Sequence, residues 1–399
     1  MTSRPTVLSI FGTRPDAIKM APVVLELGKR ESLRHVSCVT AQHRQMLDQV
    51  LALFEIKPDY DLDIMRDRQT LEEIAGRVLV ELPNVLEEVA PDIVLVHGDT
   101  STAFISALSS FYRGFKVGHV EAGLRTPDLY VPFPEEANRR LIDTICSLHL
   151  SPTENARKAL LAEGMNPTDI FVTGNTVIDA FLYTVEKTRD HPLPEPLTAL
   201  KPGSIVTITA HRRESWGEDL ASIARSLSTL ADRFPDFTFV FPIHLNPVVR
   251  ESMMPYLADR ENFIVIDPMG YLDFVALMSR SYLILTDSGG IQEEAPSLGI
   301  PVLVMRDVTE RQEGIDAGCL ELVGTRTDRI VAAASRLIED EEIHRKMSYA
   351  GNPYGDGKAS WRIGNILEKW LAHEEISEED RKSDSFHFTP EPQCYRMSE

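Results

Sequence analysis

The segment 282–300, YLILTDSGGIQEEAPSLGI, constrains the fold more than any other part of the chain. An apolar run at 282–285 ends in a turn of small residues, and a segment of helical character follows directly. This order is typical of a buried parallel strand that delivers the chain into a helix. The free N–H groups of the first helical turn, together with the helix dipole, can hold an anion such as phosphate. Ser288, Gly289 and Gly290 are therefore candidate phosphate ligands, although ordinary helix capping is the alternative explanation.

Short apolar runs alternate with amphipathic segments along both halves of the chain. The segment 43–54, for example, places its apolar residues on one helical stripe. Apolar runs of a few residues are typical of parallel strands that are buried on both faces. We therefore predict strands at 7–11, 35–39, 93–97, 116–120, 148–151 and 171–173, and again at 204–209, 237–242, 263–266, 282–286, 301–305 and 320–323.

The length of 399 residues exceeds what one hydrophobic core normally organises, so two domains are expected. The alternation predicts an α/β fold of two Rossmann-like domains, each with a parallel sheet of about six strands flanked by helices. We place the N-terminal domain at 1–185, a proline-containing linker at 186–203 and the C-terminal domain at 204–355. The acidic, aperiodic segment 374–399 is predicted to be a disordered tail.

The net charge of −20 argues against nucleic acids and anionic membrane surfaces as partners. No apolar run approaches the ~18 residues of a membrane span, so we expect no membrane insertion. The four cysteines are scattered, which indicates a reduced, cytoplasmic protein without structural zinc. The sequence shows no metal-binding cluster, and Gly12-Thr13-Arg14 is not the glycine pattern of an NAD site. We therefore expect no metal and no cofactor.

Ligands of parallel sheets bind beyond the carboxyl ends of the strands, so the residues that close each strand are the candidates. In the first domain, Arg14 and Lys19 follow the first strand, and Asp99 and Glu121 follow the third and fourth. Glu135 lies in the first turn of a predicted helix. Each of these residues alone could be a surface charge or a favourable charge at a helix end. Together they give this domain three carboxylates and two cations.

In the second domain, His211 and two arginines follow the first strand, His244 follows the second, and Arg311 follows the fifth. Salt bridges to Glu214 and Asp219 are the alternative explanation for the cations at the first strand. The first domain thus offers carboxylates, and the second offers cations and a phosphate seat. A cleft between the domains would hold a diphosphate beside a group undergoing acid–base chemistry, which indicates a nucleotide sugar.

Longer motifs surround these positions: FGTRPDAIKMAPV (11–23), TAQHRQMLDQVL (40–51), VLVHGDTSTA (94–103), VGHVEAGLRT (117–126), PEEANRR (134–140), TGNTVIDA (173–180), HRRES (211–215), PIHLNP (242–247), LTDSGGIQEEAPSLG (285–299), PVLVMRDVTER (301–311) and NPYGDG (352–357). Over roughly residues 6–370 the chain resembles the bacterial non-hydrolysing UDP-N-acetylglucosamine 2-epimerases. The resemblance implies two Rossmann-like domains of the GT-B type with an interdomain active-site cleft. It also implies a helix at 356–373 that crosses back to the first domain, and a homodimer.

The resemblance further implies the reaction, which is inversion of C2 in UDP-N-acetylglucosamine to give UDP-N-acetylmannosamine. The C2 proton has no adjacent carbonyl, so UDP leaves by anti elimination, giving 2-acetamidoglucal, and adds back in a syn sense. The family pattern assigns catalysis to Asp99, Glu121, Glu135, His211 and Lys19. It assigns substrate and UDP binding to Arg14, Lys19, Asp99, Glu121, His211, Met269, Phe274, Ser288, Gly289, Gly290, Glu294 and Arg311.

Many bacterial members of the family also bind their substrate as an activator beside the active site. The residues that match this second site are Gln42, His43, Gln45, Arg68, Glu136, Arg212 or Arg213, and His244. The loop at 65–70 departs from the glycine-containing loop that is common in relatives, and Ala210, Met269, Gln312 and Gly314 depart from the usual residues. These departures affect the expected activation and the uracil contacts rather than the catalytic groups.

Three other functions share parts of this pattern. A retaining glycosyltransferase would have the same architecture and UDP seat, but it would leave the carboxylates of the first domain unexplained. A nucleotide-sugar sensor without catalysis would not need Asp99, Glu121 and Glu135. A hydrolysing epimerase, which releases UDP and free N-acetylmannosamine, is the nearest variant.

Overall fold

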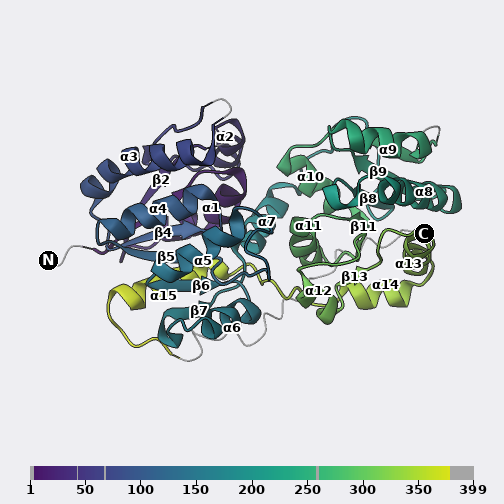
Figure 1. The fold of residues 1–399 in the computed structure, drawn as a ribbon. Helices are drawn as coiled ribbons and strands as arrows, with labels where there is room; N and C mark the ends of the chain where they lie inside the picture. Colours follow the sequence, from purple (N-terminus) through teal and green to yellow (C-terminus); the bar gives the residue numbers. More distant parts are fainter. Residues whose placement is uncertain (1–3, 43, 67–68, 258–259, 378–399) are drawn as a thin grey trace. The chain divides into compact units, whose positions relative to one another are not determined.

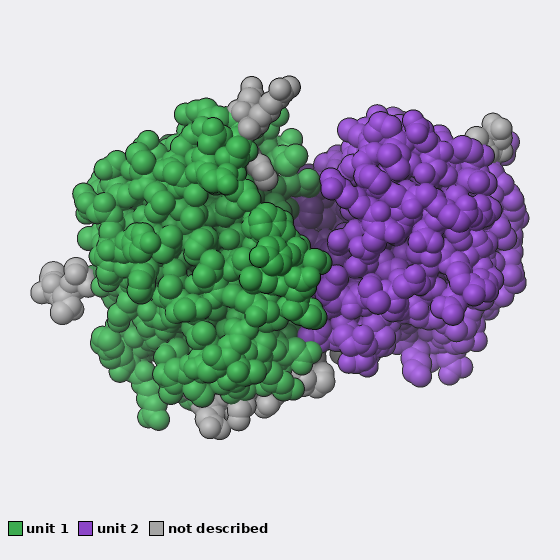
Figure 2. Space-filling model, viewed as in Figure 1, with its two compact units in different colours: residues 1–180, 355–385 green, residues 181–354, 386–399 purple. Residues whose placement is uncertain are grey.

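The computed structural model describes residues 4–42, 44–66, 69–257 and 260–377. The chain forms two compact units (Figure 2). Unit 1 contains residues 1–180 and 355–385, and unit 2 contains residues 181–354 and 386–399. The first boundary falls inside helix α7, and residues 378–399 of the predicted tail lie outside the described residues.

Unit 1 is built on a sheet of seven parallel strands in the order β3-β2-β1-β4-β5-β6-β7 (Figure 1). The strands are β1 (Thr6–Phe11), β2 (Arg34–Val39), β3 (Tyr60–Asp61), β4 (Ile93–His97), β5 (Lys116–Val120), β6 (Leu148–Ser151) and β7 (Ile170–Val172). The helices are α1 (Arg14–Gly28), α2 (Arg44–Leu53), α3 (Leu71–Val89), α4 (Ser101–Tyr112), α5 (Glu135–Ile145), α6 (Glu154–Ala162), the 3-10 turn η1 (Pro167–Asp169), α7 (Thr176–Lys187) and α15 (Ala359–Leu371).

One hydrophobic cluster of unit 1 lies between the sheet and helices α3, α4 and α5, to which these helices contribute apolar residues such as Ile74, Val78, Ala103 and Ile142. Helix α15 comes from the far end of the chain and packs against α1 of the same unit. Arg30, just after α1, fixes this contact by donating to Asn365 at 2.9 Å and to the carbonyl of Trp361 at 3.0 Å.

Unit 2 has a sheet of six parallel strands in the order β10-β9-β8-β11-β12-β13 (Figure 1). The strands are β8 (Ile205–Thr209), β9 (Thr238–Pro242), β10 (Phe263–Ile266), β11 (Ser281–Thr286), β12 (Val302–Val304) and β13 (Leu320–Leu322). The helices and 3-10 turns are η2 (Arg213–Ser215), α8 (Glu218–Arg233), α9 (Pro247–Leu257), α10 (Tyr271–Met278), α11 (Gly289–Glu294), η3 (Ala295–Leu298), α12 (Gln312–Ala317), α13 (Thr327–Glu339) and α14 (Glu341–Ser348).

The predicted α/β class with two Rossmann-like parallel sheets is confirmed, and each predicted strand agrees with a strand of the structure to within one residue at either end. The count of about six strands was wrong for unit 1, because the two-residue strand β3 was missed. The single helix expected after the 288–290 turn is also divided. It is α-helical up to Glu294 and then 3-10, since Pro296 has no N–H to continue the helix. Among the residues that the structure describes, none of the helices is long and apolar enough to span a bilayer.

Candidate active site

Each unit has one place where the strand order reverses, and the candidate residues gather there. The chain returns from β3 to β4 on the other side of β1, and from β10 to β11 on the other side of β8. Such switch points open a crevice beyond the carboxyl ends of the strands. In unit 1 the switch-point strands are followed by Arg14, Lys19 and Asp99, and in unit 2 by His211 and the 288–290 turn.

Glu121 is the buried charge at the centre of the unit 1 candidates. It follows β5, and its backbone has a φ of 69°, a left-handed conformation that is unfavourable for a residue with a side chain. Its Oε1 pairs with the Lys19 ammonium and accepts a hydrogen bond of 3.1 Å from Nδ2 of Asn175. Burial is the largest single effect and would raise the pKa of Glu121, but the charge and hydrogen bond of Lys19, together with His97 and Arg139, lower the pKa to about 2. Glu121 is therefore ionised at neutral pH.

His97, the last residue of β4, lies against the same carboxylate. Its Nε2 is 3.5 Å from Oε2 of Glu121, and the ring is buried. Burial lowers the pKa of His97 to about 3, so the ring is neutral at physiological pH. Lys19 consequently supplies the main positive charge opposite Glu121.

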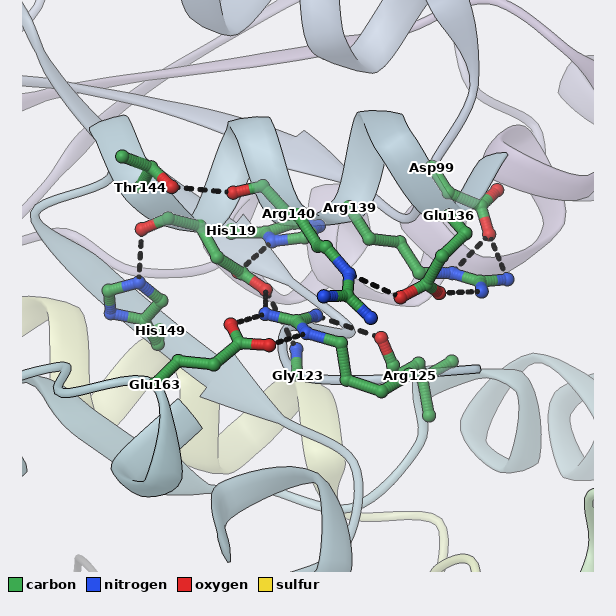
Figure 3. A network of polar contacts seen from close by, with 12 residues as sticks. Asp99, His119, Gly123, Arg125, Glu136, Arg139, Arg140, Thr144, His149 and Glu163 are labelled. Atoms are coloured by element: carbon green, nitrogen blue, oxygen red, sulfur yellow. Dashed lines mark hydrogen bonds and ion pairs between the residues drawn. The ribbon is translucent and has the colours of Figure 1, made fainter. Parts of the chain in front are cut away.

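Asp99 is oriented by helix α5 (Figure 3). Its Oδ2 lies 2.7 Å from Nη2 and 2.8 Å from Nε of Arg139, and its backbone carbonyl accepts from Nδ2 of Asn138 at 2.8 Å. Arg139 also donates to the fully buried Glu136 at 2.9 Å. Glu136 accepts further bonds from the backbone of Thr126 at 3.0 Å and from Arg140 at 2.8 Å. The Asp99 carboxylate thus sits at the end of a chain of alternating charges.

Glu135 and Arg14 occupy the first turns of α5 and α1. Oε2 of Glu135 is buried and, within the described part of the chain, has no hydrogen-bond partner. A buried unpaired carboxylate oxygen is costly, so this oxygen is ready to receive a donor or a proton. Arg14 begins α1, whose start is fixed by a capping box between Thr13 and Asp16.

A second buried network in unit 1 was not predicted from the sequence. His119 of β5 bonds Asp143 of α5, and Arg125 donates to both Asp143 and Glu163 (Figure 3). His119 lies two residues before Glu121, close to the end of β5. That spacing was the available signal, whereas nothing in the sequence marked Asp143.

In unit 2, the buried carboxylate of Asp287 organises His211. Oδ2 of Asp287 accepts the backbone N–H groups of His211 at 2.5 Å and Arg212 at 2.8 Å, and Oδ1 lies 3.1 Å from Nδ1 of His211. Burial raises the pKa of Asp287, but the bonds from His211 and the backbone lower it below its usual range. The His211 ring also stacks on His244, with centroids 5.7 Å apart. The Asp287 carboxylate and the His244 ring are thus the neighbours of the His211 imidazole.

Glu214 and Asp219, the alternative partners considered for these cations, bond to other residues. Glu214 pairs with the buried Arg306 at 2.6 Å, and Asp219 accepts from Thr325 at 3.0 Å. The partner of His211 is Asp287, a residue that sequence reasoning passed over although it directly precedes the Ser-Gly-Gly turn.

Arg311 lies directly against the 288–290 turn. A Cβ added to Gly289 would lie 3.0 Å from Cζ of Arg311, so a larger residue here would push the guanidinium back from the backbone. The guanidinium is held by Oε1 of Glu293 at 2.9 Å and lies 3.3 Å from Glu310. Glu294, on the same helix, accepts from the Tyr271 hydroxyl at 3.3 Å. The turn therefore combines backbone N–H groups with a positioned arginine.

Met269 and Phe274 flank the start of helix α10. Gly270 caps this helix, and its carbonyl accepts from the backbone N–H of Phe274 at 2.9 Å. Both Met269 and Phe274 are partly buried against a small apolar cluster that includes Ala276 and Leu277. Within the described residues, no group of three or more His, Cys, Asp or Glu side chains is arranged to hold a metal ion.

The residues expected to form an activator site have diverse surroundings. Gln42 accepts from Thr102 at 2.7 Å, Gln45 and His244 are exposed, and the Nε atom of Arg212 is buried without a hydrogen-bond partner among the described residues. Both oxygens of Glu136 are already bonded inside unit 1. His43 and Arg68 lie outside the described residues.

The chain is similar to known proteins over most of its length. Residues 25–368 match the family model described as UDP-N-acetylglucosamine 2-epimerase. The chain is 53% identical over 368 residues to UDP-N-acetylglucosamine 2-epimerase of Escherichia coli K12, covering 91% of this chain and 98% of the relative. It is 50% identical to the Bacillus subtilis 168 enzyme of the same name, covering 92% and 95%. The crystal structure of UDP-GlcNAc 2-epimerase from Neisseria meningitidis bound to UDP-GlcNAc superposes with a TM-score of 0.80 at 50% identity, covering 91% of this chain and 100% of that one.

Proposed function

Because the chain belongs to the UDP-N-acetylglucosamine 2-epimerase family, we propose that it interconverts UDP-N-acetylglucosamine and UDP-N-acetylmannosamine without releasing free sugar. The observation that carries this proposal is the ionised, buried Glu121, paired with Lys19 at the carboxyl edge of the unit 1 sheet. A carboxylate and an ammonium in contact are the two charges that proton removal and loss of a diphosphate require.

In the proposed first half-reaction, a carboxylate takes the C2 proton while the C1–O bond breaks. The C–H electron pair becomes the C1–C2 double bond of 2-acetamidoglucal, and the electron pair of the C1–O bond leaves with UDP. In the second half, a UDP oxygen attacks C1 and a proton is delivered to the opposite face of C2. UDP is a competent leaving group because the second pKa of a terminal phosphate is about 6.

Asp99, Glu121 and Glu135 are the proposed proton-transfer groups, and we leave their assignment to the two faces of C2 open. The low pKa of Glu121 makes it a weak base while Lys19 stays paired with it. If Lys19 moves to the diphosphate of a bound substrate, the pKa of Glu121 rises because burial then acts without its main counter-charge. Substrate binding would thereby activate the base.

The proposed UDP ligands belong to unit 2. His211 and the Ser288, Gly289 and Gly290 turn would hold the phosphates, with Arg311 beside the turn. One such donor to developing charge is typically worth about 10²–10³ in rate. Glu294 would take the ribose hydroxyls, and Met269 and Phe274 would lie beside uracil. Arg14 and Lys19 of unit 1 would contact the sugar and diphosphate of the same substrate.

We also propose that the protein is a homodimer and that a second UDP-N-acetylglucosamine activates it through Gln42, Gln45, Arg212 and His244, with His43, Arg68 and Glu136 as further candidates. The buried Nε of Arg212, which has no hydrogen-bond partner among the described residues, supports a ligand contact at this position. A sigmoidal dependence of rate on substrate concentration would support activation, and a hyperbolic one would contradict it.

Incubation with UDP-N-acetylglucosamine in D₂O tests the central proposal. Reversible epimerisation places deuterium at C2 of both nucleotide sugars, because the proton that returns comes from solvent. Accumulating UDP with free N-acetylmannosamine would instead show a hydrolysing enzyme. Unlabelled substrate that is consumed only when an acceptor sugar is added would show a glycosyltransferase, and bound but unchanged substrate would show a sensor.

A further inference from the structure

His119 is fully buried in β5, and each of its ring nitrogens meets an acceptor. Nδ1 lies 2.6 Å from Oδ1 of Asp143, and Nε2 lies 2.7 Å from the backbone carbonyl oxygen of Gly98. A carbonyl oxygen can only accept, so Nε2 carries a hydrogen and donates it to Gly98. This donor reaches from one strand end to the peptide group that directly precedes Asp99.

Both backbone polar groups of Gly98 bond to residues of β5. Its N–H donates to the carbonyl of Val120 at 3.0 Å, and its C=O accepts from His119. Gly98 has a φ of 64°, a left-handed turn that sends the chain from β4 towards α4 with Asp99 at the bend. A Cβ at Gly98 would lie 3.4 Å from Oε2 of Glu121, so this turn also borders the second carboxylate.

Asp143 fixes the orientation of the His119 ring. While Oδ1 faces His119, Oδ2 accepts from the backbone of Gly123 at 3.2 Å and from Nη2 of Arg125 at 2.8 Å. Arg125 is itself held by both oxygens of Glu163, at 2.8 and 2.7 Å (Figure 3). With every partner engaged, the imidazole has no alternative arrangement that keeps its hydrogen bonds.

We propose that His119, oriented by Asp143, is a positioning residue whose hydrogen bond to Gly98 aims Asp99 and Glu121 at C2 of the sugar. This inference rests on the proposed epimerisation. His119 touches neither substrate nor reacting atoms. It acts through the Gly98 turn, which carries Asp99, and through the end of its own strand, which carries Glu121. A displacement of ~1 Å in such groups can cost about 100-fold in rate.

Three substitutions separate the Gly98 bond from general damage to the core. His119→Phe removes both ring nitrogens, and His119→Gln removes the partner of Asp143 but keeps an amide N–H within reach of Gly98. Both variants therefore remove the hydrogen bond between residue 119 and Asp143. Only the phenylalanine variant also removes the hydrogen bond to the carbonyl of Gly98. The control is His149→Phe. His149 is the cross-strand neighbour of His119 on β6, equally buried, and bonded at 2.9 Å to the backbone of Asp143 rather than to Gly98.

Steady-state kinetics with UDP-N-acetylglucosamine and thermal melts give the readouts. We expect His119→Phe to lower kcat about 100-fold while KM stays within about threefold, because UDP contacts in unit 2 dominate binding. His119→Gln should have a kcat at least about tenfold higher than that of His119→Phe. His149→Phe should keep kcat within about threefold of the wild-type value, although its Tm falls about as much as that of His119→Phe. If His119→Phe does not fold, His119→Asn replaces it, since that side chain reaches Asp143 but not Gly98.

Equal kcat values for the phenylalanine and glutamine variants would overturn the proposal, as would a matching loss of kcat in His149→Phe. A wild-type protein that leaves the C2 hydrogen unexchanged in D₂O would refute the proposed function itself, independently of these variants. The two failures are therefore distinguishable.

Discussion

Replacing Lys19 with methionine should destabilise unit 1 through Glu121. The two side chains form an ion pair in which Lys19 is 19% exposed and Glu121 only 8%. Methionine keeps most of the apolar stem of lysine and removes the ammonium. Glu121 would then retain the Asn175 hydrogen bond and the nearby ring of His97, which is neutral because burial lowers its pKa to about 3.

The size of the effect follows from the pKa of Glu121. Burial pushes this pKa up, but the charge and hydrogen bond of Lys19, together with His97 and Arg139, more than offset burial, and the pKa falls from 4.5 to about 2. At about 1.4 kcal/mol for each pKa unit, the ionised state gains roughly 3 kcal/mol from its folded surroundings. That is the magnitude expected when one partner of a buried ion pair is removed, about 3–5 kcal/mol.

The deficit should also depend on pH. A carboxyl group whose folded pKa is depressed contributes stability that is fully present above its unfolded pKa, near 4.5, and is lost as pH falls towards 2. In the variant the pKa of Glu121 rises, so its carboxylate takes up a proton at higher pH and escapes the cost of a buried charge. The difference in free energy of unfolding between wild type and Lys19→Met should therefore shrink between pH 7 and pH 5.

Urea unfolding at both pH values measures this difference. In a Trp216→Phe background, fluorescence comes from Trp361 and Trp370 of α15 and reports on unit 1. The double variant Lys19→Met/Glu121→Gln is the matched control and should recover most of the loss, since no buried charge remains. A deficit below about 1 kcal/mol at pH 7, or one of equal size at both pH values, would refute the reasoning.

Three further changes test other parts of the site. Asp287→Asn should lower kcat about 100-fold or more and also weaken UDP binding, because His211, a proposed phosphate ligand, loses the carboxylate that orients it; an unchanged kcat would contradict this role. Arg311→Lys should weaken UDP binding about tenfold by calorimetry, since an ammonium cannot bond Glu293 and a phosphate in the same planar geometry. Burial raises the pKa of Asp16 to about 7, so between pH 4 and pH 7 the folded state binds a proton that the unfolded state does not. The free energy of unfolding therefore falls as pH rises from 4 to 7. Asp16→Asn should therefore gain Tm relative to wild type as pH rises from 4 to 7, and parallel Tm curves would exclude the effect.

The strands could be predicted from the sequence because parallel strands buried on both faces appear as nearly continuous apolar runs. β3 escaped prediction because it has only two residues, Tyr60 and Asp61, and neither is fully buried. It pairs with β2 through Cys38 and Val39 at the edge of the sheet, where a strand needs no apolar run. Local composition cannot indicate a strand that its neighbour alone holds in place.

The candidate site residues could be predicted from the sequence for a different reason. In a doubly wound sheet, ligands bind beyond the carboxyl ends of the strands, so the residues that follow each predicted strand are candidate site residues. The partners of these residues are harder to predict, because two side chains that meet in space can be far apart in sequence. Salt bridges to Glu214 and Asp219 were only the alternative explanation for the cations after β8, yet the carboxylate beside His211 is that of Asp287, 76 residues away. The register of β8 and β11 sets Thr209 opposite Thr286, and this register brings the two loops together.

The ion pairs also bear on how a chain with a net charge of −20 could take an anionic ligand. Lys19 is paired with Glu121, and Arg311 with Glu293, so neither cation faces a ligand as a bare charge. In the proposed reaction, a diphosphate bound at Lys19 would share this cation with a carboxylate that is already in place. Any charge that Lys19 gave to the diphosphate would be withdrawn from Glu121. Loss of UDP and the basicity of Glu121 would then be coupled through one ammonium group, which would favour proton removal when the substrate is bound.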